Sequence, residues 1–319
     1  MTPSRFQRPC IVATATRRQA PLLKFAPLTV ADIPAIMPFL PQAHSRTCDF
    51  TVGGLLMWTQ YFSYSYAICR DTLFIKGVTE DDVTRPAFSL PVGKMGLEEA
   101  VALLRHYCRI NGDSPLTFSA VPEVYVEPLR LLGASEITPL EDWSDYLYDI
   151  EALSSLSGKH LSKKRNHVNR FMADNPAFEF TPLTSANAAE VERIYSLEQL
   201  PLSKPALADV EREQVMEVLR HLDAYPFEGA VLSTPSQGIV AFTLGEVIGD
   251  TLYVHIEKMR HDVAGAGETI NKLFAARMAA EHPGLAYVNR EEDVGDPGLR
   301  YAKTSYHPCM LLRKFNVRF

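Results

Sequence analysis

The stretch that decides the fold runs from Tyr253 to Phe274 and reads YVHIEKMRHDVAGAGETINKLF. It begins with the alternation typical of a β-strand and ends as a helix that opens at Gly265-Ala266-Gly267. Glycines at a strand-to-helix turn let backbone N–H groups approach a ligand closely, and the helix start adds unpaired donors. The stretch therefore indicates either an anion site beside an acid or base, or an ordinary tight turn.

Alternation along this strand predicts which side chains share a face of the sheet. One face would carry Leu252, Val254 and Ile256, and the other Tyr253, His255 and Glu257. A carboxylate at the end of a buried strand tends to have a raised pKa, which suits a general base. The alternative for Glu257 is a structural ion pair with Lys258 or Arg260.

A second polar cluster follows the next predicted strand. The sequence YVNREEDVGDPGLR places Arg290, Glu291, Glu292 and Asp293 in consecutive positions. Ligands bind at strand ends in α/β sheets, and adjacent acids can hold an amine or a hard metal ion. A solvated loop is the commoner explanation for such a run, so we expect no metal site.

A basic helix is predicted over GKHLSKKRNHVNRF, because no acid occurs between Glu151 and Asp174. On this helix Arg165 falls on the inward stripe, at i+4 from Leu161. An inward arginine needs an anion, either a carboxylate of the core or a bound phosphate. A charged, solvated face is the alternative for the run as a whole.

The C-terminal stretch GLRYAKTSYHP adds Lys303 and Tyr306. A tyrosine can protonate a leaving group, although packing aromatics are commoner. The motifs of P-loop ATPases, zinc proteases and serine hydrolases are absent, and GAGETI lacks the third glycine of a dinucleotide fold.

Length and composition set the broad class. A chain of 319 residues, with 46% apolar and 22% charged residues, predicts a folded protein of two domains. No apolar run approaches the ~20 residues that span a bilayer. The net charge of −6 argues against a broad nucleic-acid surface. Five scattered cysteines without C-x-x-C exclude a zinc ribbon and favour reduced thiols of a cytoplasmic protein.

The order of predicted elements divides the chain. Residues 1–22 are basic without an apolar segment and are expected to be a flexible extension rather than a secretory signal. Residues 23–150 then alternate helices and strands and close with the strand DYLYDI. Residues 151–319 repeat that order, with three consecutive strands before the glycine-opened helix. We therefore expect an α+β protein with two domains, each a mixed, mostly antiparallel sheet flanked by helices.

The second half resembles the GNAT (N-acetyltransferase-like) fold, and more closely the C-terminal domain of phosphatidylglycerol lysyltransferases and their soluble relatives. The resemblance is carried by HIEK before a glycine-opened helix, by NREED, GLR and AK-SY-P, and by KKRNHVNRF. In the first half only element order and CDFTVGGLLMW are similar. Glu257-Lys258-Met259-Arg260 matches the family's acidic-x-Met-Arg stretch, with Glu in place of Asp. Asp262 stands where acetyl-CoA enzymes carry Gln or Arg.

The resemblance implies an acyl or aminoacyl transferase without a tightly bound cofactor. Its co-substrate would be aminoacyl-tRNA or acyl-CoA, and its acceptor a small or lipid-like molecule. The implied catalytic residues are Glu257, Arg260 and Tyr306, and the donor phosphate would lie near Gly265, Gly267, Lys164 and Arg165. Implied substrate-binding residues are His255, Asn289, Arg290, Glu291, Glu292 and Lys303. The alternatives are a CoA-dependent N-acyltransferase and a non-catalytic protein that binds a ligand or tRNA.

Overall fold

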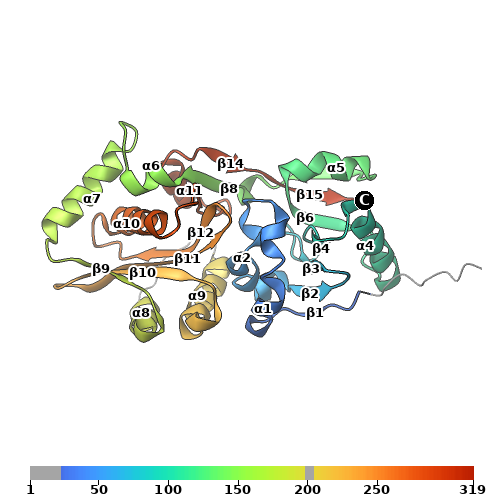
Figure 1. The fold of residues 1–319 in the computed structure, drawn as a ribbon, viewed down its shortest axis with the longest axis horizontal. Helices are drawn as coiled ribbons and strands as arrows, with labels where there is room; N and C mark the ends of the chain where they lie inside the picture. Colours follow the sequence, from blue (N-terminus) through green and yellow to red (C-terminus); the bar gives the residue numbers. More distant parts are fainter. Residues whose placement is uncertain (1–22, 198–204) are drawn as a thin grey trace, which may run out of the picture.

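The computed structural model describes residues 23–197 and 205–319, and the extension expected at residues 1–22 lies outside them. The described chain forms two mixed sheets that lie side by side, one of eight strands and one of seven (Figure 1). Helices flank both sheets, and most strand pairs are antiparallel. The predicted α+β class is therefore confirmed.

The first sheet is built mainly from the N-terminal half of the chain. Its strands follow the order β1 (Ala26–Pro27), β2 (Ser65–Ile68), β3 (Thr72–Val78), β4 (Pro86–Phe88), β6 (Thr117–Pro122), β15 (Lys314–Arg318) and β7 (Glu136–Pro139), and β5 (Val92–Gly93) pairs with β3. Alternating residues on both sides of Arg70-Asp71 predict a hairpin, and β2 and β3 turn there, where both residues have positive φ. Asn111-Gly112 predicts the end of a helix, and α4 (Leu97–Asn111) ends at Gly112.

The second sheet contains the strand of the stretch Tyr253–Phe274, which is part of β12. Its order is β14 (Met310–Leu312), β8 (Asp145–Asp149), β13 (Tyr287–Asn289), β12 (Thr251–Met259), β11 (Gly238–Ile248), β10 (Glu228–Thr234) and β9 (Glu179–Pro182). One face is covered by α6 (Ile150–Ser155), α7 (Ser162–Asp174), α10 (Ala266–Glu281) and α11 (Pro297–Thr304). The other face is covered by α8 (Ser185–Leu197) and α9 (Pro205–Arg220) (Figure 1).

Two strands cross the predicted domain boundary at residue 150. β8 (Asp145–Asp149), expected to close the first domain, pairs with β13 and β14 of the second sheet. β15 (Lys314–Arg318), at the C-terminal end, returns to the first sheet between β6 and β7. The boundary prediction is therefore too late by one strand, and it missed the returning strand. The residues next to β8 and β15 therefore lie where the two sheets meet.

The two sheets also share one apolar core. The short helices α1 (Ile33–Ile36) and α2 (Val52–Leu56) lie between the sheets (Figure 1). Their buried side chains, such as Ile36 and Val52, belong to the same cluster as Val215 of α9 and Ile256 of β12. Because this core is continuous, α1 and α2 form part of the floor beneath the second sheet.

Candidate functional site

The central feature of the second sheet is a place where two parallel strands diverge. β12 pairs with β13 only from Thr251 to Tyr253, and β13 ends at Asn289. β12 continues to Met259 and stays paired with β11 on its other side. The backbone of β12 beyond Tyr253 therefore has no ladder partner on the β13 side among the described residues. A sheet that opens in this way provides a slot at its strand ends.

A β-bulge at His255 changes the predicted faces of β12. Leu244 of β11 pairs with Ile256, and Gly245 pairs with Val254, so His255 is an extra residue. Leu252 and Val254 pack in the core beneath α10, whereas Ile256 packs in the core on the opposite face. The prediction that the three share a face is wrong, and so is the grouping of Tyr253 and His255 with Glu257. The bulge turns Glu257 toward α10.

Glu257 lies in the slot with an arginine from the neighbouring strand end. Its Oε1 accepts from Arg290 Nη2 at 2.8 Å, and its Oε2 accepts from Asn271 Nδ2 of α10 at 3.0 Å. The Glu257 side chain is 11% exposed and that of Arg290 13%. The pair is mostly withdrawn from solvent but not sealed off from it.

Two aromatic rings and a lysine complete this cluster. The Arg290 guanidinium lies 4.9 Å from the centre of the Tyr306 ring and 5.9 Å from that of Tyr148. Lys164 Nζ lies 4.3 Å from the Tyr306 ring centre and 3.5 Å from Glu268 Oε1. Burial lowers the pKa of Lys164, and Glu268 partly offsets this effect. Burial also raises the pKa of Tyr306, so its hydroxyl keeps its proton.

Several polar atoms of this cluster have no hydrogen-bond partner among the described residues. They include Arg290 Nη1, a donor, and Asn271 Oδ1, an acceptor, and both atoms are buried. An unsatisfied buried polar atom costs about 1–3 kcal/mol, so such atoms are rare in folded proteins. An orphaned donor and an orphaned acceptor, on residues that both bind Glu257, indicate a place for a polar ligand.

The structure gives the two glycines a packing role. Gly265 has φ +82°, and a Cβ there would lie 2.5 Å from the carbonyl oxygen of His167 in α7. A Cβ on Gly267 would lie 2.8 Å from Met259 Cε. Both glycines therefore permit close packing against protein. The first turn of α10 already carries an anion, the carboxylate of Glu268, which binds His167 and Lys164.

The structure places two predicted anion ligands away from Glu257. Arg165 donates to the carbonyl oxygens of Leu156 and Gly158, at 2.5 and 3.2 Å, so carbonyls of the α6–α7 loop satisfy it and the predicted anion is not needed. Arg260 donates to Asp262 at 2.7 and 3.1 Å, and weakly to the carbonyl oxygen of Gln237. Arg290, rather than Arg260, is the guanidinium that meets Glu257.

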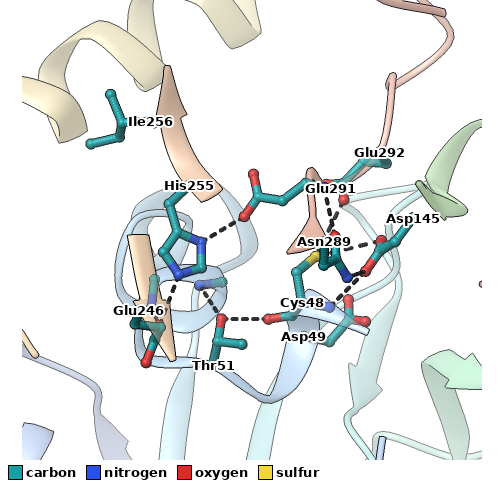
Figure 2. A network of polar contacts seen from close by, with 12 residues as sticks. Cys48, Asp49, Thr51, Asp145, Glu246, His255, Ile256, Asn289, Glu291 and Glu292 are labelled. Carbon is teal, nitrogen blue, oxygen red and sulfur yellow. Dashed lines mark hydrogen bonds and ion pairs between the residues drawn. The ribbon is translucent and has the colours of Figure 1, made fainter. Parts of the chain in front are cut away.

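His255 lies on the opposite face of the sheet, where the two domains meet (Figure 2). Its Nδ1 contacts Glu291 Oε1 at 2.7 Å and its Nε2 contacts Glu246 Oε1 at 2.9 Å. The same Glu246 oxygen accepts from the backbone N–H of Gly53 in α2 at 2.7 Å. Burial lowers the pKa of His255, but the hydrogen bonds with both carboxylates outweigh it and raise the pKa to about 10. Glu246 thus links His255 to the first domain, and neither His255 nor Glu291 faces Glu257.

A buried lysine organises the second part of this junction. Lys314 Nζ lies 2.6 Å from Asp145 Oδ1, 3.0 Å from Asp49 Oδ2 and 3.7 Å from Glu292 Oε2. Cys48, Asp145 and Glu292 have metal-ligand atoms within reach of one another. The Lys314 ammonium is already the cation among them, 3.4 Å from Cys48 Sγ. These residues therefore do not fit a metal ion.

The remaining predicted substrate ligands also belong to the junction. Asn289 donates to Asp145 at 2.7 Å and to the carbonyl oxygen of Arg46 (Figure 2). Lys303 donates to the carbonyl oxygen of Glu292. Of the predicted site residues, the structure therefore brings together Glu257, Arg290, Tyr306 and Lys164. It separates them from His255, Asn289, Arg260, Arg165, Glu291, Glu292 and Lys303.

Sequence reasoning missed three contributors to the site: Asn271, Tyr148 and Glu268. Glu268 and Asn271 stand three residues apart in the first turns of α10, which places them on one face of the helix. This three-residue spacing, in a helix that follows Glu257 and a glycine turn, could have been used to predict Glu268 and Asn271 as site residues. Tyr148 offered no such signal, because it lies on β8, which was assigned to the other domain.

The family of the chain follows from comparison with known proteins. The family model described as "Phosphatidylglycerol lysyltransferase, C-terminal" matches residues 41–318. A conserved protein of unknown function from Bacteroides thetaiotaomicron is 29% identical in sequence. Its crystal structure covers 93% of this chain and 100% of its own, with a TM-score of 0.83. The match over most of both chains shows a shared architecture.

Two further similarities are more distant. The C-terminal domain of a putative lysylphosphatidylglycerol synthetase from Agrobacterium fabrum covers 90% of this chain and 91% of its own, at 12% identity and a TM-score of 0.62. An uncharacterised protein of Mycoplasmoides gallisepticum is 24% identical over 194 residues, which are 56% of this chain and 57% of that protein. The match thus spans little more than half of this curated relative. The two mixed sheets flanked by helices that were expected from the sequence are confirmed.

Proposed function

The chain belongs to the phosphatidylglycerol lysyltransferase C-terminal family, and from this premise we propose that it transfers an activated acyl or aminoacyl group to an amine or hydroxyl acceptor. Family and fold support a transferase in general. The observation that carries the proposal is the meeting of Glu257 and Arg290 in the slot between β12 and β13. Unsatisfied polar atoms of Arg290 and Asn271 lie in the same cluster.

The proposed chemistry is a direct displacement without a covalent enzyme intermediate. The acceptor N–H or O–H loses its proton to Glu257 while its nitrogen or oxygen attacks the carbonyl carbon of the activated ester. Arg290 Nη1, which has no hydrogen-bond partner among the described residues, is the donor for the oxyanion that forms. The ester bond then breaks as Tyr306, which burial keeps protonated, gives its proton to the leaving oxygen. The proton taken up by Glu257 then returns to Tyr306 through solvent, which restores both groups. Holding both substrates in one slot supplies much of the rate.

The charges around α10 favour an aminoacyl ester over acyl-CoA as the donor. A pyrophosphate would need the first turn of α10, where the Glu268 carboxylate already lies beside Lys164. Asp262, which pairs with Arg260, adds a second carboxylate before the helix. Like charges at short range oppose a pyrophosphate. The open edge of β12 still suits an extended thioester chain, so a CoA-dependent N-acyltransferase is the second candidate.

Native mass spectrometry separates these donors. The wild-type chain is mixed with a charged tRNA pool in one experiment and with acetyl-CoA in another. The proposal expects a complex with charged tRNA that releases uncharged tRNA when an amine pool is added. A complex with acetyl-CoA alone would support the second candidate. Binding without turnover of either donor would support the non-catalytic alternative and contradict the proposed transferase.

The matched variant for this experiment is Glu257→Gln, which keeps the shape of the side chain and a donor–acceptor pair for Asn271. Loss of one general base typically lowers the rate by about 10²–10⁴-fold. We expect donor binding to persist while transfer falls by that factor. Full transfer by the Glu257→Gln variant would remove Glu257 from the catalytic residues.

A further inference from the structure

A hollow of about 530 Å³ lies in the first domain, away from the Glu257 site, between α4 and Phe319. Its lining is partly polar and partly apolar, and the apolar part includes the mostly buried side chains of Val101 and Leu116. Leu132 and the ring of Phe319 form part of its wall. The volume falls within the range of about 300–1,000 Å³ that is typical of small-molecule sites.

Two arginines line this groove from one face of α4. Arg105 and Arg109 stand four residues apart, so they lie one above the other along the helix. The Arg105 guanidinium lies 5.5 Å from the centre of the Phe319 ring. This stacking orients the guanidinium and leaves its N–H edge available.

Neither guanidinium of the groove has a carboxylate partner among the described residues. Other exposed arginines of the first domain pair with carboxylates, as Arg70 does with Glu99, Arg85 with Asp82 and Arg130 with Glu127. Within the ranges 23–197 and 205–319, neither Arg105 nor Arg109 forms an ion pair. Glu98 also lines the groove, yet it does not bind either guanidinium. The groove therefore holds two guanidiniums without an ion-pair partner in the described ranges, beside apolar side chains such as Leu132 and Phe319.

We propose that this groove binds an organic phosphate ester. The phosphate lies between Arg105 and Arg109, since two guanidinium forks match the several oxygens and the double charge of a phosphate monoester better than those of a carboxylate. The apolar or aromatic part of the ligand lies on Leu116, Leu132 and Phe319. This site is independent of the proposed transferase function, because it uses no residue of the Glu257 cluster.

Calorimetric titration of the full chain with phenyl phosphate tests this proposal. Burial of the ring should make phenyl phosphate bind about tenfold more tightly than inorganic phosphate. Arg105→Gln and Arg109→Gln should each weaken binding by about tenfold, since each removes a charge-assisted contact. Arg85→Gln is the control, because Arg85 is also exposed but lies outside the groove, and it should leave binding unchanged.

Two further arms identify the source of the phosphate. Saturable binding of adenosine monophosphate would assign the site to a soluble ester. Retention of the chain on vesicles that contain phosphatidic acid, lost in both groove variants, would assign it to a lipid headgroup. Either result supports the site. No saturable binding of phenyl phosphate, or equal binding by wild type and both groove variants, would overturn the proposal.

Discussion

Arg290, at the end of one strand, donates a 2.8 Å hydrogen bond to Glu257 on the neighbouring strand, across the gap where the two strands have stopped pairing. Here the divergence of β12 and β13 and the bulge at His255 bring the two side chains together. Within residues 23–197 and 205–319, Arg290 Nη1 has no hydrogen-bond partner, which is the property expected of a group that binds a ligand.

The ion pair of Glu257 and Arg290 should be strongly coupled. Arg290→Met leaves a mostly buried carboxylate without its partner, so we expect a loss of about 3 kcal/mol in the free energy of unfolding. In the Glu257→Gln/Arg290→Met double variant the loss should be smaller than the sum of the single losses by at least about 1 kcal/mol. Urea unfolding of the four proteins measures this coupling.

A matched cycle on Glu127 and Arg130 provides the control, because both side chains are more than half exposed. Exposed pairs couple by only about 0.2–1 kcal/mol. Equal coupling in the two cycles would show that the Glu257–Arg290 pair is an ordinary surface contact.

His255 should make the domain junction sensitive to alkaline pH. Its pKa is raised to about 10 in the folded protein, against about 6.5 in the unfolded chain. Its contribution to stability is therefore complete below about pH 6.5 and is lost as pH rises toward 10. The stability difference between wild type and His255→Gln should shrink by up to about 1.4 kcal/mol per pH unit in that window. Chemical unfolding at pH 7 and 9.5 measures it, and a constant difference would contradict the buried imidazolium.

Glu292 should have a related effect in a lower pH range. Burial raises its pKa to about 7, so ionisation in the folded protein is unfavourable, and stability falls as pH rises from about 4.3 through 7. Glu292→Gln removes this charge, while Lys314 keeps its ion pairs with Asp145 and Asp49. We expect the variant to be more stable than wild type by about 2 kcal/mol at pH 8 and to match it near pH 4. A less stable variant at pH 8 would show that Lys314 requires the third carboxylate.

Gly265 should be the glycine least tolerant of substitution in the deciding stretch. Gly265→Ala combines a positive φ with a Cβ placed 2.5 Å from the His167 carbonyl oxygen. Gly158→Ala has nearly the same φ, +81°, but its Cβ meets nothing within 4 Å, so it isolates the backbone cost of about 1 kcal/mol. We expect Gly265→Ala to cost at least about 2 kcal/mol more than Gly158→Ala. Equal melting temperatures would show that α7 moves aside without loss.

The sequence predicted the fold well where the signals were local. The turn at Arg70-Asp71, the helix end at Gly112 and the strand-to-helix turn at Gly265 all depend on neighbouring residues, and all are present. The domain boundary depends instead on pairing between distant segments. The residues of β8 predict a strand but not the sheet to which it belongs. That assignment follows only from its pairing with β13 and β14.

The site was predicted in part for the same reason. Glu257 and Tyr306 could be found from chemistry and resemblance, and both lie in the cluster. The choice of Arg260 as the guanidinium followed from the family's acidic-x-Met-Arg stretch, whereas Arg290 lies at the end of the next strand. The bulge at His255 has no signature in the alternating residues, so the faces of His255 and Ile256 could not be predicted.

Single-turnover transfer from radiolabelled charged tRNA to a pool of amine and hydroxyl acceptors tests the central claim most directly. Wild type, Glu257→Gln and Arg290→Met are compared at donor concentrations that saturate binding. The account predicts labelled product from wild type, with rates at least about 10²-fold lower in both variants and with donor binding retained. Wild-type rates in both variants would show that the slot between β12 and β13 is not where acyl transfer takes place.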